Sequence, residues 1–372
     1  MKKILFLIHD LGPGGAEKVL VNLVNNMDPK QFDITVMTLF DVGINKQFLA
    51  PHIHYRTCFK KMFRGNSHVM KLLTPRQLHK WLIKEKYDIE ISYLEGPSAR
   101  IVSGCPHADT KLVAWIHCLS KKQGNVTLGF RSYKEAAAAY GRFDRVIAVS
   151  RTVEAAFRAV FPQIPNTTVL YNTNESDKIL RLAQERVEEG VFQPQECRLV
   201  GIGKLAPVKA FDRFIRIHAK LRREGYPVHS YILGEGALRP ELERLVQELG
   251  MGESFTFLGY QTNLYKYLAK CDLFVCSSLS EGFSTAATEA LIVGTPVVTT
   301  LVSGMKEMLG EHNEYGIVTE NDEDALYLGI KKLLDDPALL AHYKQQAHLR
   351  GKDFSTEETV RAVEQMFYQL TE

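Results

Sequence analysis

The sequence predicts an α/β protein with two doubly wound domains. Short Val-, Ile- and Leu-rich runs typical of strands, such as KKILFLI at 2–8, alternate with amphipathic segments typical of helices, such as AEKVLVNLVNNM at 16–27. Apolar strands separated by helices are typical of parallel sheets covered on both faces. At 372 residues the chain is too long for one core of ordinary size. A polar stretch, EEGVFQPQE at 188–196, divides the alternation into two series, so two such domains are expected.

The expected elements follow one another in a regular order. In the first series we expect strands at 2–8, 32–40, 88–94, 111–117, 144–150 and 167–172, with helices at 16–27, 74–86 and 152–161. In the second we expect strands at 198–203, 229–234, 254–260, 272–278 and 296–300, with helices at 211–225, 238–250, 263–271 and 285–294. These runs predict an N-terminal domain over 1–175, a C-terminal domain over 196–354 and a final helix within 355–372. Because ligands of such sheets bind beyond the carboxyl ends of the strands, we expect the chemistry in the following loops, at a cleft between the domains.

The composition, with 45% hydrophobic and 24% charged residues, is that of a soluble globular protein. The net charge of +3 gives no reason to expect a nucleic-acid partner, but the charge is uneven. Residues 1–175 contain 24 Lys and Arg against 14 Asp and Glu, whereas the remainder contains 22 against 29. The six cysteines form no C-x-x-C pair, which suits a reduced, cytoplasmic protein. The opening apolar run stops at His9 and Asp10, so we expect a strand and no signal peptide, and no run is long enough to predict a membrane span.

Two glutamates stand eight residues apart in SEGFSTAATEALIVGTPVVTT, residues 280–300. Glu281 precedes Gly282, which we place in the turn before a helix, while Glu289 would project from the second turn of that helix. One carboxylate at the open end of a helix and another on its side can hold two ends of one polar ligand.

A second candidate loop, IGKLAPVKAFD at 202–212, places Lys204 and Lys209 between a strand and a helix. Two cations beside a helix N-terminus can bind an anion such as a diphosphate. Surface lysines on a loop are the simpler alternative for this stretch by itself. A nucleotide-sugar site needs cations that bind phosphates and carboxylates that bind hydroxyls. The two lysines together with Glu281 and Glu289 supply both.

The N-terminal half offers weaker signals. The glycines of LGPGGAEK, 11–18, let the backbone approach a ligand after the first strand, although the spacing is neither G-x-G-x-x-G nor a Walker A loop. A tight turn is the alternative interpretation. His117 ends the expected strand KLVAWIH; such a histidine is often structural, but its position lies at the expected cleft.

Residues 58–86 interleave eight cations with Phe, Met, Leu and Trp against the single acid Glu85. This pattern suits an anionic membrane surface, and a solvated helix face with a loop is the equal alternative. DED at 322–324 fits a D-x-D metal motif, but its place just before a helix favours an N-cap. We expect no metal site there.

The sequence resembles the retaining, GT-B-fold glycosyltransferases of family 4 over nearly its whole length. Four features carry the resemblance: GPGGAEK, VGIGKLAPVKAFD, FLGY, and SEGFSTAATEALIVGTPVV, which matches the family's E-x7-E motif. It implies two Rossmann-like domains that face an interdomain cleft, and a last helix, 355–372, that returns to the first domain. It also implies a nucleotide-sugar donor, with no cofactor and no metal.

The resemblance also implies roles for individual residues. Glu281 would contact hydroxyls of the donor sugar, Glu289 the ribose hydroxyls, and Lys204 and Lys209 the diphosphate leaving group. His117 would lie beside the reacting carbon. The remaining donor contacts would come from backbone groups and from the pocket for the base: Gly15, Leu258, Tyr260, Gly282, Phe283 and Ser284.

Two positions depart from the family, which usually has arginine at Lys204 and glycine at Ala210. Lysine keeps the charge but loses bidentate geometry, so stabilisation of the leaving group is weaker or differently shared. No carboxylate is evident at the His117 position, so the sequence does not support a covalent glycosyl-enzyme. The family resemblance implies front-face attack with retention, in which the departing phosphate takes the acceptor's proton.

The function expected from these features is transfer of a hexose from a UDP- or GDP-sugar to a lipid-linked or polysaccharide acceptor, as in capsule or exopolysaccharide assembly. The basic first half favours peripheral attachment to the inner face of the plasma membrane. A nucleotide-sugar epimerase of similar fold and a non-catalytic glycosyltransferase-like partner subunit are the alternatives. A solute-binding protein is disfavoured, because no secretion signal is evident. The sequence leaves the sugar, base, linkage and oligomeric state open.

Overall fold

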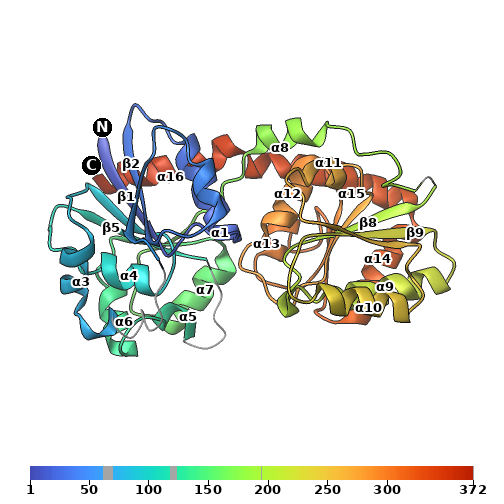
Figure 1. Ribbon diagram of the computed structural model, residues 1–372, viewed down its shortest axis with the longest axis horizontal. Helices are drawn as coiled ribbons and strands as arrows, with labels where there is room; N and C mark the ends of the chain where they lie inside the picture. Colours follow the sequence, from blue (N-terminus) through green and yellow to red (C-terminus); the bar gives the residue numbers. More distant parts are fainter. Residues whose placement is uncertain (62–69, 118–123, 194, 372) are drawn as a thin grey trace. The chain divides into compact units, whose positions relative to one another are not determined.

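The computed structural model describes residues 1–61, 70–117, 124–193 and 195–371, which form two units (Figure 1). The first unit contains residues 1–174 and 356–372, and the second contains residues 175–355. The final helix, α16 (Thr356–Thr371), therefore belongs to the first unit, where it packs against α1 (Gly15–Asn26). The Thr356 hydroxyl donates to the carbonyl of Asn174 (2.7 Å). This contact joins the two chain segments of the first unit.

Within the described residues, the first unit has a seven-stranded parallel sheet in the order β3-β2-β1-β4-β5-β6-β7. Its strands are β1 (Lys2–Ile8), β2 (Phe32–Phe40), β3 (His54–Phe59), β4 (Ile89–Ser92), β5 (Lys111–Ile116), β6 (Arg145–Ala148) and β7 (Thr167–Val169). Its other helices are η1 (Ile44–Phe48), α3 (Pro75–Leu82), α4 (Pro97–Val102), α5 (Gly124–Thr127), α6 (Tyr133–Tyr140) and α7 (Arg151–Val160). The last five residues of β1 are buried, as expected for a central strand covered on both faces.

The second unit has a six-stranded sheet among its described residues, in the order β10-β9-β8-β11-β12-β13. Its strands are β8 (Cys197–Ile202), β9 (Val228–Leu233), β10 (Phe255–Gly259), β11 (Leu273–Cys276), β12 (Val297–Thr300) and β13 (Ile317–Thr319). Its helices are α8 (Ser176–Ala183), η2 (Pro207–Lys209), α9 (Phe211–Arg223), α10 (Arg239–Glu248), α11 (Tyr265–Leu268), α12 (Thr285–Val293), α13 (Met305–Leu309), α14 (Glu323–Asp335), α15 (Pro337–Gly351) and η3 (Lys352–Phe354). Strand order reverses between β8 and β11, which makes this point the expected ligand site of the sheet.

Several local predictions were wrong. The helix expected over 74–86 ends at Leu82, because Ile83 adopts an extended backbone and buries its side chain. Strand β3 was missed because this edge strand alternates polar and partly buried residues, and helices α4 and α6 were missed as well.

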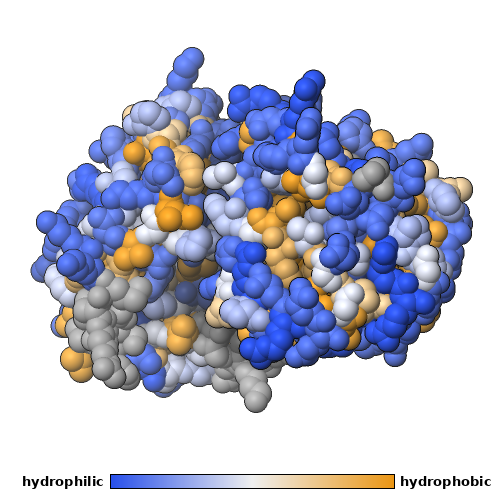
Figure 2. Space-filling view, turned by 45° about the vertical axis from the view of Figure 1, so that its right-hand side comes forward, coloured by the Kyte–Doolittle hydropathy of each residue, from blue (hydrophilic) through white to orange (hydrophobic). Residues whose placement is uncertain are grey.

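The face of the molecule in Figure 2 is largely hydrophilic, with groups of apolar side chains between the hydrophilic ones. The five described cysteines are free, and Cys118 lies outside the described residues.

Candidate active site in the C-terminal unit

Two loops meet at the point where strand order reverses in the second unit. One follows β8 and leads through η2 to α9, and the other follows β11 and leads to α12. The backbone N–H of Leu279 donates to the carbonyl of Val208 (2.8 Å), and the Ser277 hydroxyl donates to the carbonyl of Lys209 (2.8 Å). These two hydrogen bonds hold the lysine loop and the Glu281 loop together, although they are distant in sequence.

The charged centre of this site is an ion pair between Lys209 and Glu281. The Lys209 Nζ atom lies 2.6 Å from Glu281 Oε1, and the Ser278 hydroxyl donates to the same oxygen (2.6 Å). Burial lowers the pKa of Lys209, but the nearby Glu281 carboxylate and Cys276 outweigh it, so the net change is a raised pKa. Lys209 is therefore a protonated, partly buried cation with one carboxylate partner.

The backbone around Lys209 has an unusual conformation. Ala210, the residue that links η2 to α9, is left-handed with φ 46° and ψ 47°. This conformation costs an alanine roughly 1–2 kcal/mol relative to a right-handed one and costs glycine little. Lys204 is exposed, and no ion pair joins it to a described residue. The structure therefore holds Lys209 at the centre of the site and leaves Lys204 at its exposed edge.

Glu289 lies in the second turn of α12 and is 2% exposed. The Tyr265 hydroxyl, from α11, donates to Glu289 Oε1 (3.1 Å). Helix α12 begins after its N-cap Ser284, whose hydroxyl accepts from the Ala287 N–H (3.4 Å). The helix ends at Gly294 in the left-handed conformation, where glycine is favoured. Glu281 thus belongs to the loop and Glu289 to the helix, as the sequence predicts, but the second carboxylate is buried rather than presented to solvent.

The other predicted donor residues of this unit differ in their exposure. Phe283 is 6% exposed and packs on Phe354, with ring centroids 5.9 Å apart. Gly282 precedes it in the loop. Leu258 lies in the edge strand β10 and its carbonyl accepts from the Gln261 side chain (2.6 Å), whereas Tyr260 is 62% exposed. Their roles towards a ligand stay predictions.

In the first unit, His117 follows β5 and is 7% exposed. Its ring lies against Tyr93, with centroids 4.8 Å apart, and burial lowers its pKa to about 3. The imidazole is therefore neutral near pH 7, and within the described part of the chain its Nε2 atom has no hydrogen-bond partner. The backbone N–H of His117 donates to Glu95 Oε2 (3.1 Å), so a carboxylate does stand beside this position.

Gly15 opens helix α1 and is exposed. Glu17 follows in the first turn of the same helix, where burial, reinforced by Asp10, raises its pKa. These residues place polar groups beyond the carboxyl end of β1, the edge at which ligands of such sheets bind.

One group with metal-binding side chains occurs among the described residues, in the first unit. His79, Glu90 and Cys105 are buried, with their ligand atoms within 4.8 Å of one another. His79 Nε2 and Glu90 Oε2 lie 2.8 Å apart, and the Cys105 thiol, whose pKa burial raises to about 11, donates to Glu90 Oε1 (3.5 Å). The three side chains thus have partners in one another, and no metal ion is needed to explain their burial.

The D-x-D stretch is a helix cap. The Asp322 side chain accepts from the Ala325 N–H (2.8 Å) at the start of α14. Glu323 pairs with Arg216 (2.8 Å) and Asp324 with Lys220 (3.4 Å). These contacts agree with the N-cap interpretation.

Sequence reasoning missed the partners of the predicted residues. Ser278 contacts Glu281, Tyr265 contacts Glu289, and Glu95 contacts the backbone of His117. Ser278 and Glu95 both follow strands, a signal that could have identified them. Tyr265 lies 24 residues before its partner, and no local pattern joins the two.

Comparison with known proteins identifies the family. A family model described as Glycosyltransferase Family 4 matches residues 13–173, and one described as Glycosyl transferases group 1 matches residues 184–350. The chain therefore belongs to the GT-B glycosyltransferases of family 4.

Individual relatives extend over the whole chain. An N-acetylgalactosamine-N,N'-diacetylbacillosaminyl-diphospho-undecaprenol 4-alpha-N-acetylgalactosaminyltransferase of Campylobacter jejuni is 27% identical over 361 residues, which cover 95% of this chain and 96% of the relative. HepE of Anabaena, solved with UDP, superimposes with a TM-score of 0.79 at 22% identity over 99% of this chain and 100% of HepE. Sucrose-phosphate synthase of Thermosynechococcus elongatus superimposes with a TM-score of 0.79 at 18% identity, over 100% of this chain and 99% of the synthase. The solved structures share the GT-B fold with this chain.

Proposed function

We propose that the protein is a retaining hexosyltransferase that uses a UDP- or GDP-sugar and transfers the hexose to a lipid-linked or polysaccharide acceptor. The observation that carries this proposal is the ion pair of Lys209 and Glu281 where strand order reverses in the second sheet (2.6 Å). A partly buried cation at this point can neutralise a diphosphate, while the carboxylate can accept hydrogen bonds from sugar hydroxyls.

The relatives support each half of the proposal. HepE has been solved with UDP, and also with UDP-glucose at a TM-score of 0.76. The Campylobacter relative is named for transfer onto a diphospho-undecaprenol acceptor. We therefore favour UDP over GDP as the nucleotide of the donor, and a diphosphate-linked lipid as the acceptor. We extend the proposal to a role in capsule or exopolysaccharide assembly, which uses acceptors of this class.

The chemistry follows from the charge that develops in the donor. As the bond between the sugar C1 and the diphosphate oxygen breaks, negative charge builds on the diphosphate, and Lys209 with the N-terminal end of α9 stabilises it. The acceptor oxygen forms the new bond to C1 on the same face, and its proton passes to the departing phosphate oxygen. The neutral imidazole of His117 can donate or accept one hydrogen bond to the sugar through Nε2 without adding charge. No step needs a metal ion.

A membrane-associated location fits a lipid-linked acceptor. No helix among the described residues combines the length and apolarity needed to cross a membrane. Attachment to the inner face of the plasma membrane would therefore be peripheral in the described part of the chain.

The first test measures donor binding. The thermal midpoint of the protein is recorded with UDP, GDP, ADP and CMP, and again for Lys209→Ala and for Lys332→Ala, an exposed lysine on α14 that serves as control. A nucleotide at about 100 times its Kd adds roughly 2.7 kcal/mol of stability. We expect UDP to stabilise the wild type and the control but not Lys209→Ala. If no nucleotide stabilises the wild type, the donor site is rejected and the non-catalytic partner becomes the better hypothesis.

The second test measures the reaction. The protein is incubated with a UDP-hexose and an undecaprenyl-diphosphate glycan, and both released UDP and the anomeric configuration of the product are determined. Acceptor-dependent UDP release with an α-linked product from an α-linked donor supports the proposal. A changed nucleotide sugar without acceptor or UDP release would instead identify an epimerase.

A further inference from the structure

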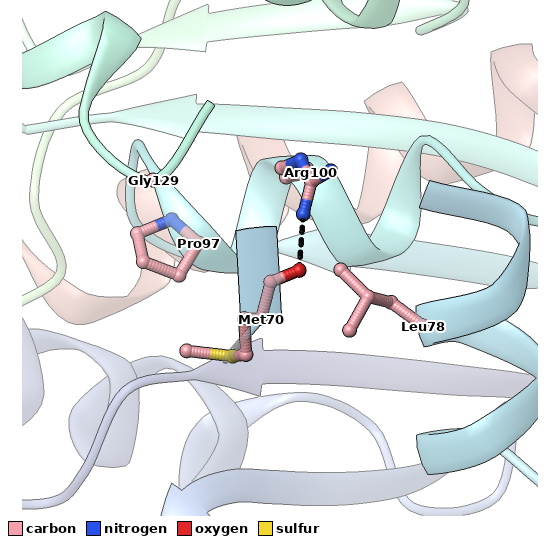
Figure 3. A pocket seen from close by; sticks show the side chains of 5 residues that line it. All are labelled: Met70, Leu78, Pro97, Arg100 and Gly129. Atoms are coloured by element: carbon pink, nitrogen blue, oxygen red, sulfur yellow. Dashed lines mark hydrogen bonds between the residues drawn. The ribbon is translucent and has the colours of Figure 1, made fainter. Parts of the chain in front are cut away.

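A short segment of the first unit, residues 70–73, is held from one side by Arg100 of α4. The Nη1 atom donates to the carbonyl of Met70 (2.7 Å), and Nη2 donates to the carbonyl of Leu73 (2.7 Å). Figure 3 shows the first of these bonds at the rim of a small pocket that Met70, Leu78, Pro97, Arg100 and Gly129 line. The two ends of the segment are thus fixed by one guanidinium.

Arg131 holds the middle of the same segment. Its Nε atom donates to the carbonyl of Lys71 (2.6 Å) and its Nη2 atom to the carbonyl of Leu72 (2.9 Å). Four consecutive carbonyls therefore have arginine donors. Hydrogen bonds to these carbonyls fix the backbone of the segment, which sets the side of the segment from which each side chain projects.

Both arginines are joined to Glu135 of α6. Arg100, which is 1% exposed, pairs with Glu135 Oε1 through Nη2 (2.9 Å), and the backbone N–H of Arg131 donates to Oε2 (2.6 Å). Breaking a buried pair leaves an uncompensated charge, so this arrangement is strongly maintained. The two arginines thus connect the segment to α4 and α6, which pack on each other (Figure 1).

This support presents apolar side chains to solvent. Leu72 is 78% exposed and Leu128 is 63% exposed. Leu128 lies three residues before Arg131, whose side chain binds the carbonyl of Leu72, and Gly129, which follows Leu128, lines the same pocket as Met70. A single exposed leucine needs no explanation, but two on segments that Arg131 joins can form one apolar contact site.

Several cations stand near these leucines in the sequence. Arg76, Lys80 and Lys84 are exposed and spaced four residues apart, so Arg76 and Lys80 lie along one face of α3 and Lys84 continues the series past its end. Lys71 adjoins Leu72, and Lys134 is exposed in the first turn of α6. No ion pair links any of the five to a carboxylate in the described ranges. Arg64, the remaining cation of the basic stretch between Lys61 and Lys71, lies outside the described residues.

We propose that Lys71, Leu72, Arg76, Lys80, Leu128 and Lys134, here called the Leu72 surface, dock on an anionic lipid bilayer. The leucines would enter the interface while the cations lie at the level of the headgroups. We favour an anionic bilayer as the partner because of the charge of this surface. Exposed leucines and cations without carboxylate partners complement a continuous negative surface, and each cation raises the affinity for such a surface about fivefold. This surface consists of residues of the first unit and its lipid binding does not require the donor loops, which belong to the second unit, but it would bring the chain to the proposed lipid-linked acceptor.

The test is co-sedimentation of the full chain with vesicles, with no nucleotide or acceptor present. We expect binding to equimolar phosphatidylglycerol and phosphatidylcholine, and little binding to phosphatidylcholine. Lys71→Gln/Arg76→Gln/Lys80→Gln should weaken binding roughly 100-fold, and Leu72→Asn/Leu128→Asn at least about tenfold. The matched controls are Lys332→Gln/Lys344→Gln/Lys352→Gln and Leu328→Asn/Leu349→Asn, which remove exposed residues of the same kinds from the second unit.

Three results would overturn the proposal: equal binding to both vesicle types, equal losses in the test and control variants, or no vesicle binding by the wild type. If binding is absent and the leucine variant instead weakens self-association in sedimentation equilibrium, a second copy of the chain is the occupant. The thermal shift with UDP is measured on the same variants. It should stay at the wild-type value, so that loss of lipid binding and loss of donor binding are separate outcomes.

Discussion

The Nζ atom of Lys209 lies 2.6 Å from Oε1 of Glu281, so the cation proposed to bind diphosphate is neutralised by the carboxylate proposed to bind the sugar. A diphosphate therefore competes with Glu281 for Lys209. The carboxylate is held in place independently by the hydroxyl of Ser278 (2.6 Å), so a ligand can share Lys209 without releasing Glu281 from the loop.

This competition predicts opposite effects on binding and turnover for Glu281→Gln. Without the carboxylate charge, Lys209 is fully available to a diphosphate, so UDP should bind about threefold more tightly, the size of a weak ion pair. Turnover should fall on the order of 100-fold, because a contact to the reacting sugar is lost. Calorimetric titration with UDP and an assay of UDP release measure the two effects. Glu320→Gln, an exposed residue with the same charge change, is the control, and unchanged UDP affinity in Glu281→Gln would contradict the competition.

The left-handed Ala210 predicts a stabilising substitution. Ala210→Gly removes a conformational cost of about 1–2 kcal/mol from the folded chain. Glycine also gives the unfolded chain more conformational freedom, which lowers the free energy of unfolding by about 0.4–1 kcal/mol. The free energy of unfolding should therefore rise by about 0.5–1 kcal/mol in urea denaturation. Ala206→Gly is the control, because Ala206 has φ −135° and gains nothing from glycine. A loss of stability in both variants would show that Ala210 carries no strain.

The sequence predicts the parallel sheets and the order of elements because buried apolar strands such as β1 leave a continuous local signal. It predicts Lys209 and Glu281 together only through their positions after strands, since 72 residues separate them. The supporting contacts are different in kind. Tyr265 reaches Glu289 because α11 packs on α12, a tertiary contact with no local pattern.

The edges of the elements are equally hard to predict. The helix expected over 74–86 would continue past Leu82, but Ile83 adopts an extended backbone and is 4% exposed. Likewise, no pattern in the sequence predicts that Arg100 pairs with Glu135. Burial of such charges depends on partners that only the folded chain brings together.

The hydrogen bond from Tyr265 to Glu289 predicts a positioning role for the tyrosine. Tyr265→Phe removes one hydrogen bond to a buried carboxylate, which should lower the free energy of unfolding by about 1.5–3 kcal/mol. If Glu289 binds the ribose, the wild type should prefer UDP over 2′-deoxy-UDP, and this preference should shrink in Tyr265→Phe. Tyr267→Phe on the same helix is the control, since its hydroxyl donates to the exposed Glu188 (2.7 Å). A preference that is unchanged in Tyr265→Phe would leave the tyrosine a purely structural residue.

The burial of His117 predicts how stability depends on pH. Its pKa is about 3 in the folded chain against an ordinary value of 6.5, so below 6.5 the unfolded chain binds a proton that the folded chain does not. The contribution of His117 to the free energy of unfolding is therefore fully present above the pKa of the unfolded chain, and it is lost as the pH falls below that value. On going from about pH 7.5 to about pH 5.5, the wild type should lose about 1.4 kcal/mol more than His117→Asn. Urea denaturation at the two pH values measures this difference, with His342→Asn on the surface of α15 as control. Equal losses in the wild type and His117→Asn would mean that the imidazole takes up its proton in the folded chain. In that case it could not act as the neutral hydrogen-bonding group proposed beside the reacting sugar.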